Sequence, residues 1–448
     1  MAASGGSRSF HNTGGALRIL WLSNSPLVQS GYGEQTKLFT PRIRDLGHEV
    51  AIAANFGIQS TVTVWDGMAV FPAQAHNATV STFARHHKAD WVIMLYDSWV
   101  MKPDDWDDDL EHVAMWAPVD EWPPPIAVME VLKHEKVQPI AMSRFGEHWL
   151  NKAGLEPLYV PHGVDTQVFR PIEDGRRVAR EILAMPEDAF VVGMVAANRG
   201  WSLHACRKAF PQAFDAFAQF ARKHDDAYMY CHTQATPAPP GIDLVMCARA
   251  LGIPEDRIAF PPDVAWHLHV MDSAFVAGMM NGFDVLLNAS MSEGFGIPII
   301  EAQACGVPVI TSDHSSMPEL TQSGWLVSGD RWWDGSQLAF GIMPSVDSIL
   351  ERLEEAYENR GNQKIKDDAV EFAQTYDADR VTELYWKPAL EALGRPTEIA
   401  PFKPNRAMRR QKPNKTEKRR VAELDARGIA LDAEIGKLER EVEREVRR

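Results

Sequence analysis

Two glutamates eight residues apart flank a glycine-rich turn. Glu293 precedes the sequence GFGI, and Glu301 follows Pro298 by three positions. Glycine lets a backbone lie close to a ligand, and proline fits the first turn of a helix, where a missing N–H costs nothing. The N–H groups at a helix start attract phosphate, and carboxylates accept hydrogen bonds from hydroxyl groups. A diphosphate at the helix start with hydroxyls beside it describes a nucleoside diphosphate sugar.

The elements that must position this turn are a strand before it and a helix and strand after it. Val285 to Leu287 is an apolar run of strand length, and Val307 to Thr311 is a second run after Gly306. This order is the building block of a parallel α/β sheet. An ordinary buried turn explains the apolar residues but not two acids with close-set glycines and prolines. Ligands bind beyond the carboxyl ends of such strands, so we expect both acids to face that crevice.

The sequence EGFGIPIIEAQACGVPVI, from Glu293 to Ile310, closely resembles the signature of retaining glycosyltransferases of family 4 (glycosyl transferases group 1). Met317-Pro318-Glu319 continues the pattern, and the resemblance extends over residues 17–393. It implies an α/β fold of the GT-B type, in which two Rossmann-like domains face a cleft and a C-terminal helix crosses back. A charged helical tail would follow this crossover helix.

The resemblance also implies a chemistry. It predicts a hexosyltransferase (EC 2.4 class) that takes a hexose from a nucleoside diphosphate sugar with retention of anomeric configuration. No essential metal and no cofactor are expected, and the donor substrate would be a UDP-sugar or a GDP-sugar. The acceptor is left open, with protein, glycan, lipid and modified nucleic acid all compatible.

Four residues are expected to be catalytic: Glu293, Asp120, Arg207 and Lys208. Glu293 would bind the sugar hydroxyls, and the two cations would stabilise charge on the leaving diphosphate. Asp120 is assigned only from its position after an apolar run, where family members often carry a histidine or an acid. No residue is assigned as a nucleophile, and no metal ligands are expected. The predicted donor contacts are Glu301 (ribose hydroxyls), Gly31, Gly33, Gly294, Phe295, Gly296, Ile297, Asn198, Arg199 and Pro261.

Some of these residues also fit a purely structural or solvent-exposed role. Arg207 and Lys208 are chosen over Arg199, although the segment between them departs from the family's short Arg-x-x-Lys-Gly form. The alternative is that these cations lie at a solvated helix start and bind no ligand. Gly31 and Gly33 fit a tight turn as well as a phosphate loop. The tryptophans at strand ends fit a core or domain interface as well as carbohydrate recognition. His162 is expected to support the turn between the domains.

The chain is long enough for two domains, each with its own core. We predict the following divisions: 1–16, a disordered leader; 17–165, an N-terminal Rossmann-like acceptor domain; 166–187, a linker; 188–380, a C-terminal Rossmann-like donor domain; 381–395, the crossover helix; and 396–448, a basic linker and charged helical tail. Other expectations concern single elements: one strand over Thr61 to Val70, a helix over Ile126 to Lys136, a solvated loop over Asp104 to Glu111, and a last strand at Trp325 to Val327.

Composition narrows the class of protein. The chain has 448 residues with 45% hydrophobic and 24% charged residues, and these are ordinary globular values. Four cysteines without CxxC pairs predict neither a zinc site nor a disulfide framework. No apolar run has membrane-spanning length and no signal peptide is recognisable, so a cytoplasmic protein without a membrane span is expected.

The net charge of −15 argues against nucleic-acid binding over the whole surface. The positive charge gathers instead near the C-terminus, where residues 403–420 contain nine Lys and Arg and one acid. A solvated helical tail is the simplest interpretation of residues 400–448. Self-association or contact with a polyanion through this tail are the alternatives, and its deletion would then weaken nucleic-acid binding and its salt dependence.

Two other classes of function remain open. A nucleotide-sugar epimerase on the same fold would need a general base and acid about the sugar C2, and no set of acids and histidines marks one. A non-catalytic binding or scaffold protein would keep the fold and use the tail for assembly. The intact pair of Glu293 and Glu301 argues weakly against this second alternative.

Overall fold

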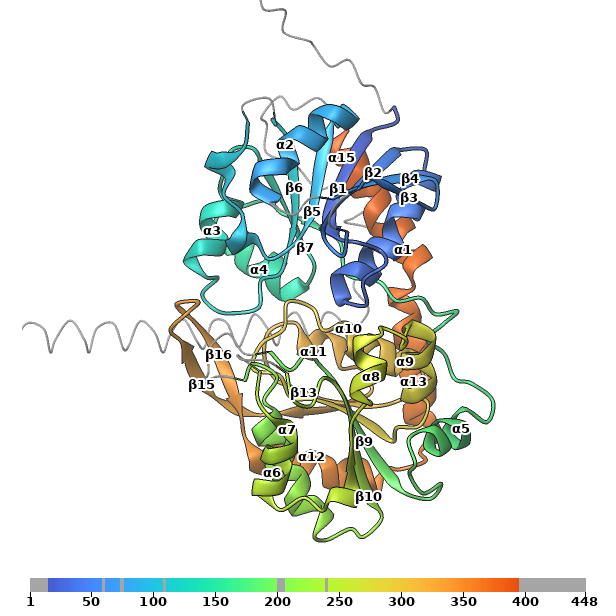
Figure 1. The fold of residues 1–448 in the computed structure, drawn as a ribbon. Coiled ribbons are helices and arrows are strands. Elements are labelled where there is room, and N and C mark those ends of the chain that lie inside the picture. The colour runs from blue at the N-terminus through green and yellow to red at the C-terminus, as the bar shows by residue number, and fades with distance from the viewer. Residues whose placement is uncertain are drawn as a thin grey trace, which may run out of the picture. The chain divides into compact units, whose positions relative to one another are not determined.

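Two β-sheets organise the fold (Figure 1). The structure, a computed structural model, describes residues 15–58, 61–72, 76–107, 110–199, 206–237 and 241–394. The strands of the first sheet are β1 (Arg18–Asn24), β2 (Glu49–Phe56), β3 (Thr63–Trp65), β4 (Met68–Pro72), β5 (Trp91–Leu95), β6 (Val113–Ala117), β7 (Val137–Ala141) and β8 (Leu158–Tyr159). They lie in the order β3-β4-β2-β1-β5-β6-β7-β8, and all neighbours are parallel except β3 and β4.

The second sheet is wholly parallel, in the order β11-β10-β9-β12-β13-β14. Its strands are β9 (Phe190–Val195), β10 (Ala227–His232), β11 (Ile258–Ala259), β12 (Val285–Asn288), β13 (Val309–Ser312) and β14 (Gly324–Val327). A separate antiparallel hairpin pairs β15 (Gly329–Asp334) with β16 (Ala339–Pro344). We call the elements β1 to β8 the first lobe and β9 to β16 the second lobe.

Helices connect the strands of both lobes. In the first lobe they are α1 (Gly31–Asp45), α2 (His76–His87), η1 (Ser98–Val100), η2 (Pro103–Asp105), α3 (Ile126–Leu132) and α4 (Arg144–Lys152). The second lobe and its connections contain α5 (Gly175–Ile182), α6 (Phe210–Ala221), α7 (Leu244–Leu251), η3 (Glu255–Arg257), α8 (Asp263–His267), α9 (Ser273–Met280), α10 (Ile297–Ala304), α11 (Met317–Leu320), α12 (Val346–Glu358) and α13 (Gln363–Ala373). The last elements are η4 (Gln374–Tyr376), α14 (Ala378–Val381), the π-helical η5 (Thr382–Trp386) and α15 (Lys387–Leu393).

The strand orders create two switch points. In the first sheet the order reverses between β1 and β5, and in the second it reverses between β9 and β12. Ligands of doubly wound sheets bind beyond the carboxyl ends of the strands at such points. The central strands are buried continuous apolar runs, as parallel strands covered on both faces require. The carboxyl ends of the strands beside these two switch points are therefore the expected ligand positions.

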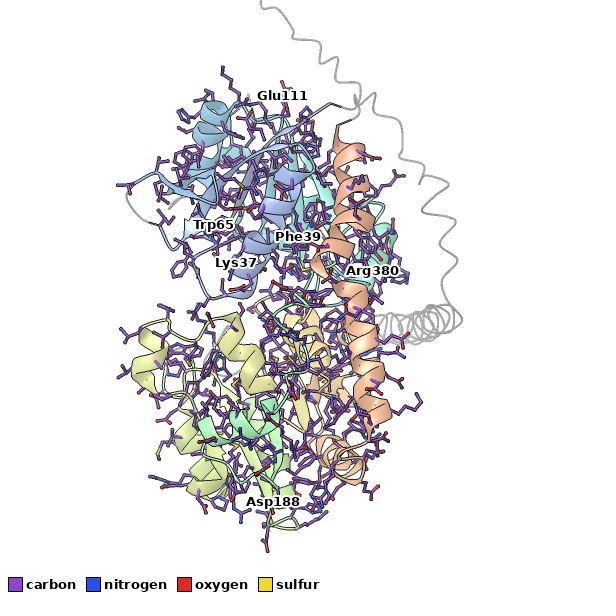
Figure 2. The ribbon with its side chains drawn as sticks, turned by 90° about the vertical axis from the view of Figure 1, so that its right-hand side faces the viewer. Lys37, Phe39, Trp65, Glu111, Asp188 and Arg380 are labelled. Atoms are coloured by element: carbon purple, nitrogen blue, oxygen red, sulfur yellow. The ribbon has the colours of Figure 1, made fainter. Side chains whose placement is uncertain are left out.

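The C-terminal helical run packs against the first lobe. Trp386 of η5 is fully buried and contacts Trp21, Phe39 and Trp116, with ring centroids 4.9 to 5.8 Å apart. Figure 2 shows this run as the orange helix, with Arg380 and Phe39 labelled. Trp116, which the sequence left open between core and ligand binding, is therefore a core residue.

Four predictions about single elements are wrong. Thr61 to Val70 is not one strand, because Asp66 and Gly67, both at positive φ, turn β3 back onto β4. The stretch Asp104 to Glu111 is not simply solvated, since Trp106 and Leu110 are buried in the core of the first lobe. The helix predicted over Ile126 to Lys136 ends at Leu132. Trp325 to Val327 is followed by the hairpin β15–β16, so it does not form the last strand.

The predicted domain boundaries remain a prediction, although the first sheet lies within residues 17–165 and the second within 188–380. All of the described residues belong to one compact unit. The predicted leader, apart from Gly15 and Ala16, and the tail lie outside the described residues. Among the described residues, no helix combines the length and the apolar character that crossing a membrane requires.

Candidate functional site

A buried ion pair forms the centre of the candidate site. Lys208, two residues before α6, contacts Glu293, which lies in the loop after β12. Ser290 donates a hydrogen bond to the same Glu293 oxygen over 2.7 Å, and the Ser315 hydroxyl accepts the Glu293 N–H at 3.0 Å. The Glu293 residue is only 6% exposed. The loop is therefore fixed on both sides of the carboxylate.

Arg207 joins this pair to the first lobe. Its guanidinium lies 3.6 Å from Glu293 and 3.9 Å from Asp120, which follows β6, and it donates to the Ser292 carbonyl at 2.8 Å. All four residues predicted to be catalytic thus lie together. They come from the ends of strands in both sheets, because the loop after β6 and the loop after β12 converge here.

Burial and charge shift the pKa values of this cluster in different directions. Burial acts to raise the pKa of Glu293, but the cations of Lys208 and Arg207 outweigh it and hold the pKa below its usual value. Burial raises the pKa of Asp120, although Arg207 opposes this effect. Burial and the neighbouring Arg207 lower the pKa of Lys208. Lys208 and Arg207 both contact the ionised Glu293, and Arg207 also lies beside Asp120, so the cluster combines two cations with at least two acids.

Two residues of the site were not assigned from the sequence. The Tyr32 hydroxyl in α1 donates a 2.8 Å hydrogen bond to Asp97, which follows β5. Burial raises the pKa of Asp97, while the Tyr32 hydrogen bond and the charge of Arg207 act to lower it. Asp97 therefore lies within electrostatic reach of the cluster. The sequence showed an acid at this strand end, but strand order alone decides that β5 and β6 are neighbours.

The glycine-rich segments bring backbones close together. Gly31 and Gly33 lie inside the first turn of α1, which Ser30 caps at 3.1 Å, and not in a free loop. A Cβ at Gly31 would lie 3.3 Å from Ile297, the first residue of α10. Gly294 leaves room for Pro118 of the first lobe, since a Cβ there would approach the Pro118 Cβ to 2.5 Å. The start of α10 is thus enclosed by elements of the first lobe.

The other two predicted members of this turn support its shape. Gly296 has φ of +102°, a conformation that side chains rarely adopt, and it immediately precedes α10. Phe295 is buried against His162, with ring centroids 5.2 Å apart. The Ser316 hydroxyl donates to the Phe295 carbonyl at 2.6 Å. Phe295 therefore anchors the turn through its ring and its carbonyl.

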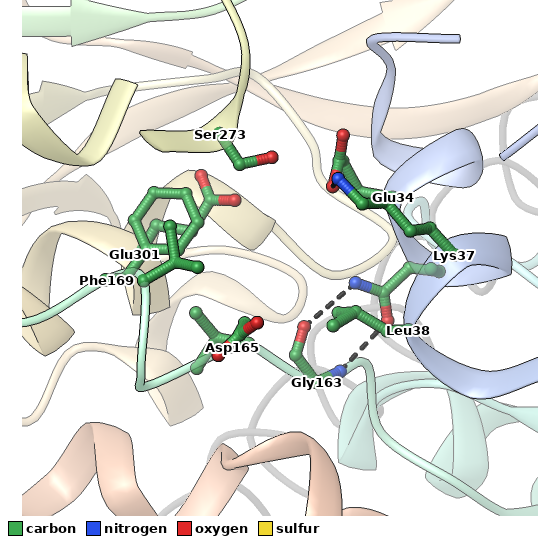
Figure 3. Close-up of a pocket in the computed structure, with 11 residues that line it drawn as sticks. Glu34, Lys37, Leu38, Gly163, Asp165, Phe169, Ser273 and Glu301 are labelled. Atoms are coloured by element: carbon green, nitrogen blue, oxygen red, sulfur yellow. Dashed lines mark hydrogen bonds and ion pairs between the residues drawn. The ribbon is translucent and has the colours of Figure 1, made fainter. Parts of the chain in front are cut away.

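Glu301 lies apart from the cation cluster, in a pocket between α1 and α10. Figure 3 shows its carboxylate on one side of the pocket, with Glu34 and Lys37 opposite and Ser273 and Asp165 on the remaining walls. Burial, together with the charge of Glu34, raises the pKa of Glu301 to about 8. The lining of the pocket combines Glu34, Lys37 and Glu301 with apolar side chains such as Phe169, and the ribose contact of Glu301 stays a prediction.

Four further predicted residues take varied positions. Asn198 is buried and uses its side chain within the loop, since it donates to the carbonyls of Gln234 and Ile242 at 3.0 and 2.7 Å. This arrangement indicates a structural role. Arg199 is exposed beside residues that are not described, and Pro261 is buried after β11. His162 bonds Gln35 over 3.0 Å, and burial lowers its pKa to about 3, as suits a neutral support of the turn.

Within the described part of the chain, no three His, Cys, Asp or Glu side chains are grouped so that they could hold a metal ion.

Residues 207–338 match the family model described as glycosyl transferases group 1. The curated relatives include D-inositol 3-phosphate glycosyltransferase 2 of Catenulispora acidiphila, 28% identical over 204 residues, which cover 44% of each chain. The D-inositol 3-phosphate glycosyltransferase of Mycobacterium tuberculosis is 31% identical over 182 residues, 38% of this chain and 33% of the relative. The chain thus spans less than half the length of the curated relatives it matches.

Solved structures resemble most of the fold. HepE of Anabaena, crystallised with UDP-glucose, has a TM-score of 0.62 and 17% identity, with 84% of this chain and 99% of that chain covered. A glycosyltransferase of Rickettsia africae has a TM-score of 0.61 and 15% identity, with coverage of 84% and 98%. These similarities identify the fold as GT-B. The match to the glycosyl transferases group 1 model covers residues 207–338 of this chain.

Proposed function

We propose that this protein transfers a hexose from a nucleoside diphosphate sugar to an acceptor, with retention of anomeric configuration. The observation that carries the proposal is the cluster of Arg207, Lys208, Glu293 and Asp120 at the carboxyl ends of both sheets. The name of the HepE structure, solved with UDP-glucose, and the names of the curated relatives support a sugar-nucleotide donor.

Each residue of the cluster has a proposed role. Arg207 and Lys208 stabilise the leaving diphosphate together with the N–H groups at the start of α10, an electrostatic contribution that is usually the largest catalytic effect. Glu293 accepts hydrogen bonds from the sugar hydroxyls, for which its lowered pKa suits it. Asp120 lies on the first-lobe side of the sugar. Glu301 binds the ribose in its own pocket.

The proposal includes no enzyme nucleophile, no cofactor and no essential metal. The donor is proposed to be a UDP-sugar or a GDP-sugar, and the protein to act in the cytoplasm. Epimerisation of the donor is the second candidate, because Asp120 lies 3.9 Å from Arg207 and burial raises its pKa, so that one acid of the site could hold a proton.

A panel of donors tests the class of reaction. Purified protein is incubated with UDP-, GDP-, ADP- and TDP-sugars without acceptor, and the released nucleotide is measured beside a Glu301→Ala variant. We expect slow release from one donor, strongly reduced in the variant. Interconversion of sugars without lasting nucleotide release would favour the epimerase. No release, together with no nucleotide binding by calorimetry, would refute the proposal.

A further inference from the structure

A hydrogen-bonded pair of the first lobe, Tyr32 and Asp97, lies beside the start of α10. Tyr32 is the second residue of α1, and its hydroxyl donates to the Oδ1 atom of Asp97 at 2.8 Å. The preceding residue, Gly31, packs against the second lobe, because a Cβ at Gly31 would lie 3.3 Å from the Ile297 side chain. Tyr32 thus holds Asp97 directly next to the contact between α1 and α10.

The other flank of the pair is the loop that carries Asp120. Asp97 follows β5 by two positions and Asp120 follows β6 by three, and because β5 and β6 are parallel neighbours, both acids leave the sheet at the same edge. This edge meets the second lobe twice. A Cβ at Gly294 would approach the Pro118 Cβ to 2.5 Å, and Asp120 lies 3.9 Å from Arg207. Asp97 is therefore placed at the first-lobe side of the candidate site.

The surroundings of Tyr32 hold the pair in one position. Ser30 caps α1, and the Asn24 side chain donates to the Ser30 hydroxyl at 2.9 Å. The Tyr32 ring contacts the ring of Tyr96, with centroids 6.1 Å apart. Burial, and then the charge of Asp97, raise the pKa of Tyr32 well above its usual value, so the hydroxyl keeps its proton and donates it to Asp97.

The second oxygen of Asp97 is available to a ligand. Among the described residues, Oδ2 has no hydrogen-bond partner, and Asp97 forms no ion pair. Asp97 is half-buried, and the neighbouring side chains of Asp120 and Arg207 are 29% and 26% exposed, so solvent reaches this part of the site. An ionised carboxylate oxygen only accepts hydrogen bonds, and a hydroxyl group is a donor of matching size.

The other acids of the cluster are committed to cations. Glu293 contacts Lys208 and Arg207, and Asp120 lies against Arg207. The side-chain partner of Asp97 is instead the neutral hydroxyl of Tyr32. Both cations proposed to hold the diphosphate come from the second lobe, so a carboxylate that faces them from the first lobe lies on the side open to a second substrate.

We propose that Asp97, held by Tyr32, accepts a hydrogen bond from the attacking hydroxyl group of the acceptor and orients its oxygen toward the anomeric carbon of the donor. The acceptor oxygen bonds to this carbon, the bond from the carbon to the diphosphate oxygen breaks with its electron pair on the diphosphate, and the hydroxyl proton passes to that oxygen. Asp97 gains no proton in the net step. The inference rests on the proposed transfer of a sugar and adds a residue that positions the acceptor.

The test uses hydrolysis of the donor that the panel selects, without acceptor, so that water takes the place of the acceptor hydroxyl. In Asp97→Asn the amide oxygen can still accept from Tyr32, and an NH2 group that cannot accept replaces the second oxygen. We expect kcat to fall about tenfold or more, as for loss of a hydrogen bond to a charged group. The KM for the donor and the Kd for its nucleoside diphosphate should change by less than about twofold, because neither depends on the attacking oxygen.

Tyr32→Phe tests the positioning residue. Asp97 keeps its charge in this variant but loses the bond that fixes it, so we expect kcat to fall about threefold. The double variant should be no slower than Asp97→Asn alone, because Tyr32 acts only through Asp97. Losses that multiply in the double variant would contradict this coupling.

The matched control removes a tyrosine–aspartate hydrogen bond elsewhere. The hydroxyl of Tyr357, on α12, donates to Asp226 at 3.0 Å, and Tyr357→Phe should keep the kinetics of the wild type. Urea unfolding of every variant shows whether the fold is retained.

The outcomes separate this inference from the proposed function. Hydrolysis by Asp97→Asn at the rate of the wild type would overturn the inference and leave the donor chemistry intact. A fall in kcat with an equal loss of nucleotide affinity would also overturn it, because the pair would then serve the donor or the fold. Absence of donor turnover by the wild type would refute the proposed function and, with it, the inference.

Discussion

Replacing Lys208 with methionine tests the ion pair that the proposed diphosphate site is built on. The two side chains are 14% (Lys208) and 8% (Glu293) exposed, so this is not a surface pair worth less than about 1 kcal/mol. Removing one partner of a buried pair costs about 3–5 kcal/mol. Arg207 and Ser290 continue to contact Glu293, at 3.6 and 2.7 Å, so we expect a loss near the lower limit.

The same change should weaken nucleotide binding. A hydrogen bond to a charged group contributes about 1.5–3 kcal/mol, which corresponds to a roughly 10- to 150-fold rise in the Kd for a nucleoside diphosphate. Stability is measured from the midpoint of urea unfolding, and affinity by calorimetry. The matched control is Lys223→Met, because Lys223 is 58% exposed and pairs with Glu354 at 2.9 Å. This control should change neither quantity appreciably.

A double variant separates the two effects. In Lys208→Met with Glu293→Gln, no unpaired carboxylate is left buried, so much of the lost stability should return. Affinity for the nucleoside diphosphate should remain low, since the cation is still missing. If the single variant binds nucleotide as tightly as wild type while its unfolding midpoint falls, Lys208 is a structural residue and the proposed diphosphate site is wrong.

Three further predictions follow from other parts of the fold. Glu293→Gln should keep nucleoside diphosphate binding but lower donor hydrolysis at least tenfold, because only the bond to the sugar is weakened; unchanged hydrolysis would contradict its role. Burial and Glu34 raise the pKa of Glu301 to about 8, so the folded protein holds this proton and the free energy of unfolding should fall as pH rises from about 4.5 to about 8. Affinity for the donor sugar nucleotide should rise over the upper part of this range if the ionised carboxylate binds ribose, and Glu301→Gln should flatten both profiles; equal slopes in the variant would refute the assignment. Trp386→Ala should cost about 3–5 kcal/mol in urea unfolding, since the ring is fully buried between lobe elements; a loss below about 1 kcal/mol would show that the packing is dispensable.

Local patterns predicted the strand and the helix that flank Glu293 and carry Glu301. The acids and glycines from Glu293 to Glu301 lie within one strand–loop–helix unit, so their spacing in the sequence nearly fixes their spacing in space. Asp120 was predicted only from its position at the end of a strand. Its closeness to Arg207 depends on how the loops of two sheets converge, and no local pattern encodes that geometry.

The hairpin β15–β16 shows a different limit of prediction from sequence. Its Asp334-Gly335 turn between aromatic runs is a recognisable hairpin signal, so this hairpin, unlike the predicted last strand at Trp325 to Val327, has a local sequence pattern. The burial of Glu121 had no local signal. It depends on the pairing of Trp122 with Phe340, more than 200 positions later in the sequence, which buries the carboxyl group beside Asp334.

The central claim is that this site breaks the bond between a sugar and a nucleoside diphosphate and passes the sugar on with retention. The most direct measurement is an NMR time course with a donor labelled with ¹³C at the anomeric carbon, incubated with the protein and a neutral sugar acceptor. We expect the donor signal to decay into a product signal of the same anomeric configuration while free nucleoside diphosphate accumulates. A donor signal that stays constant, turns into an epimer without nucleotide release, or gives the inverted anomer would contradict it.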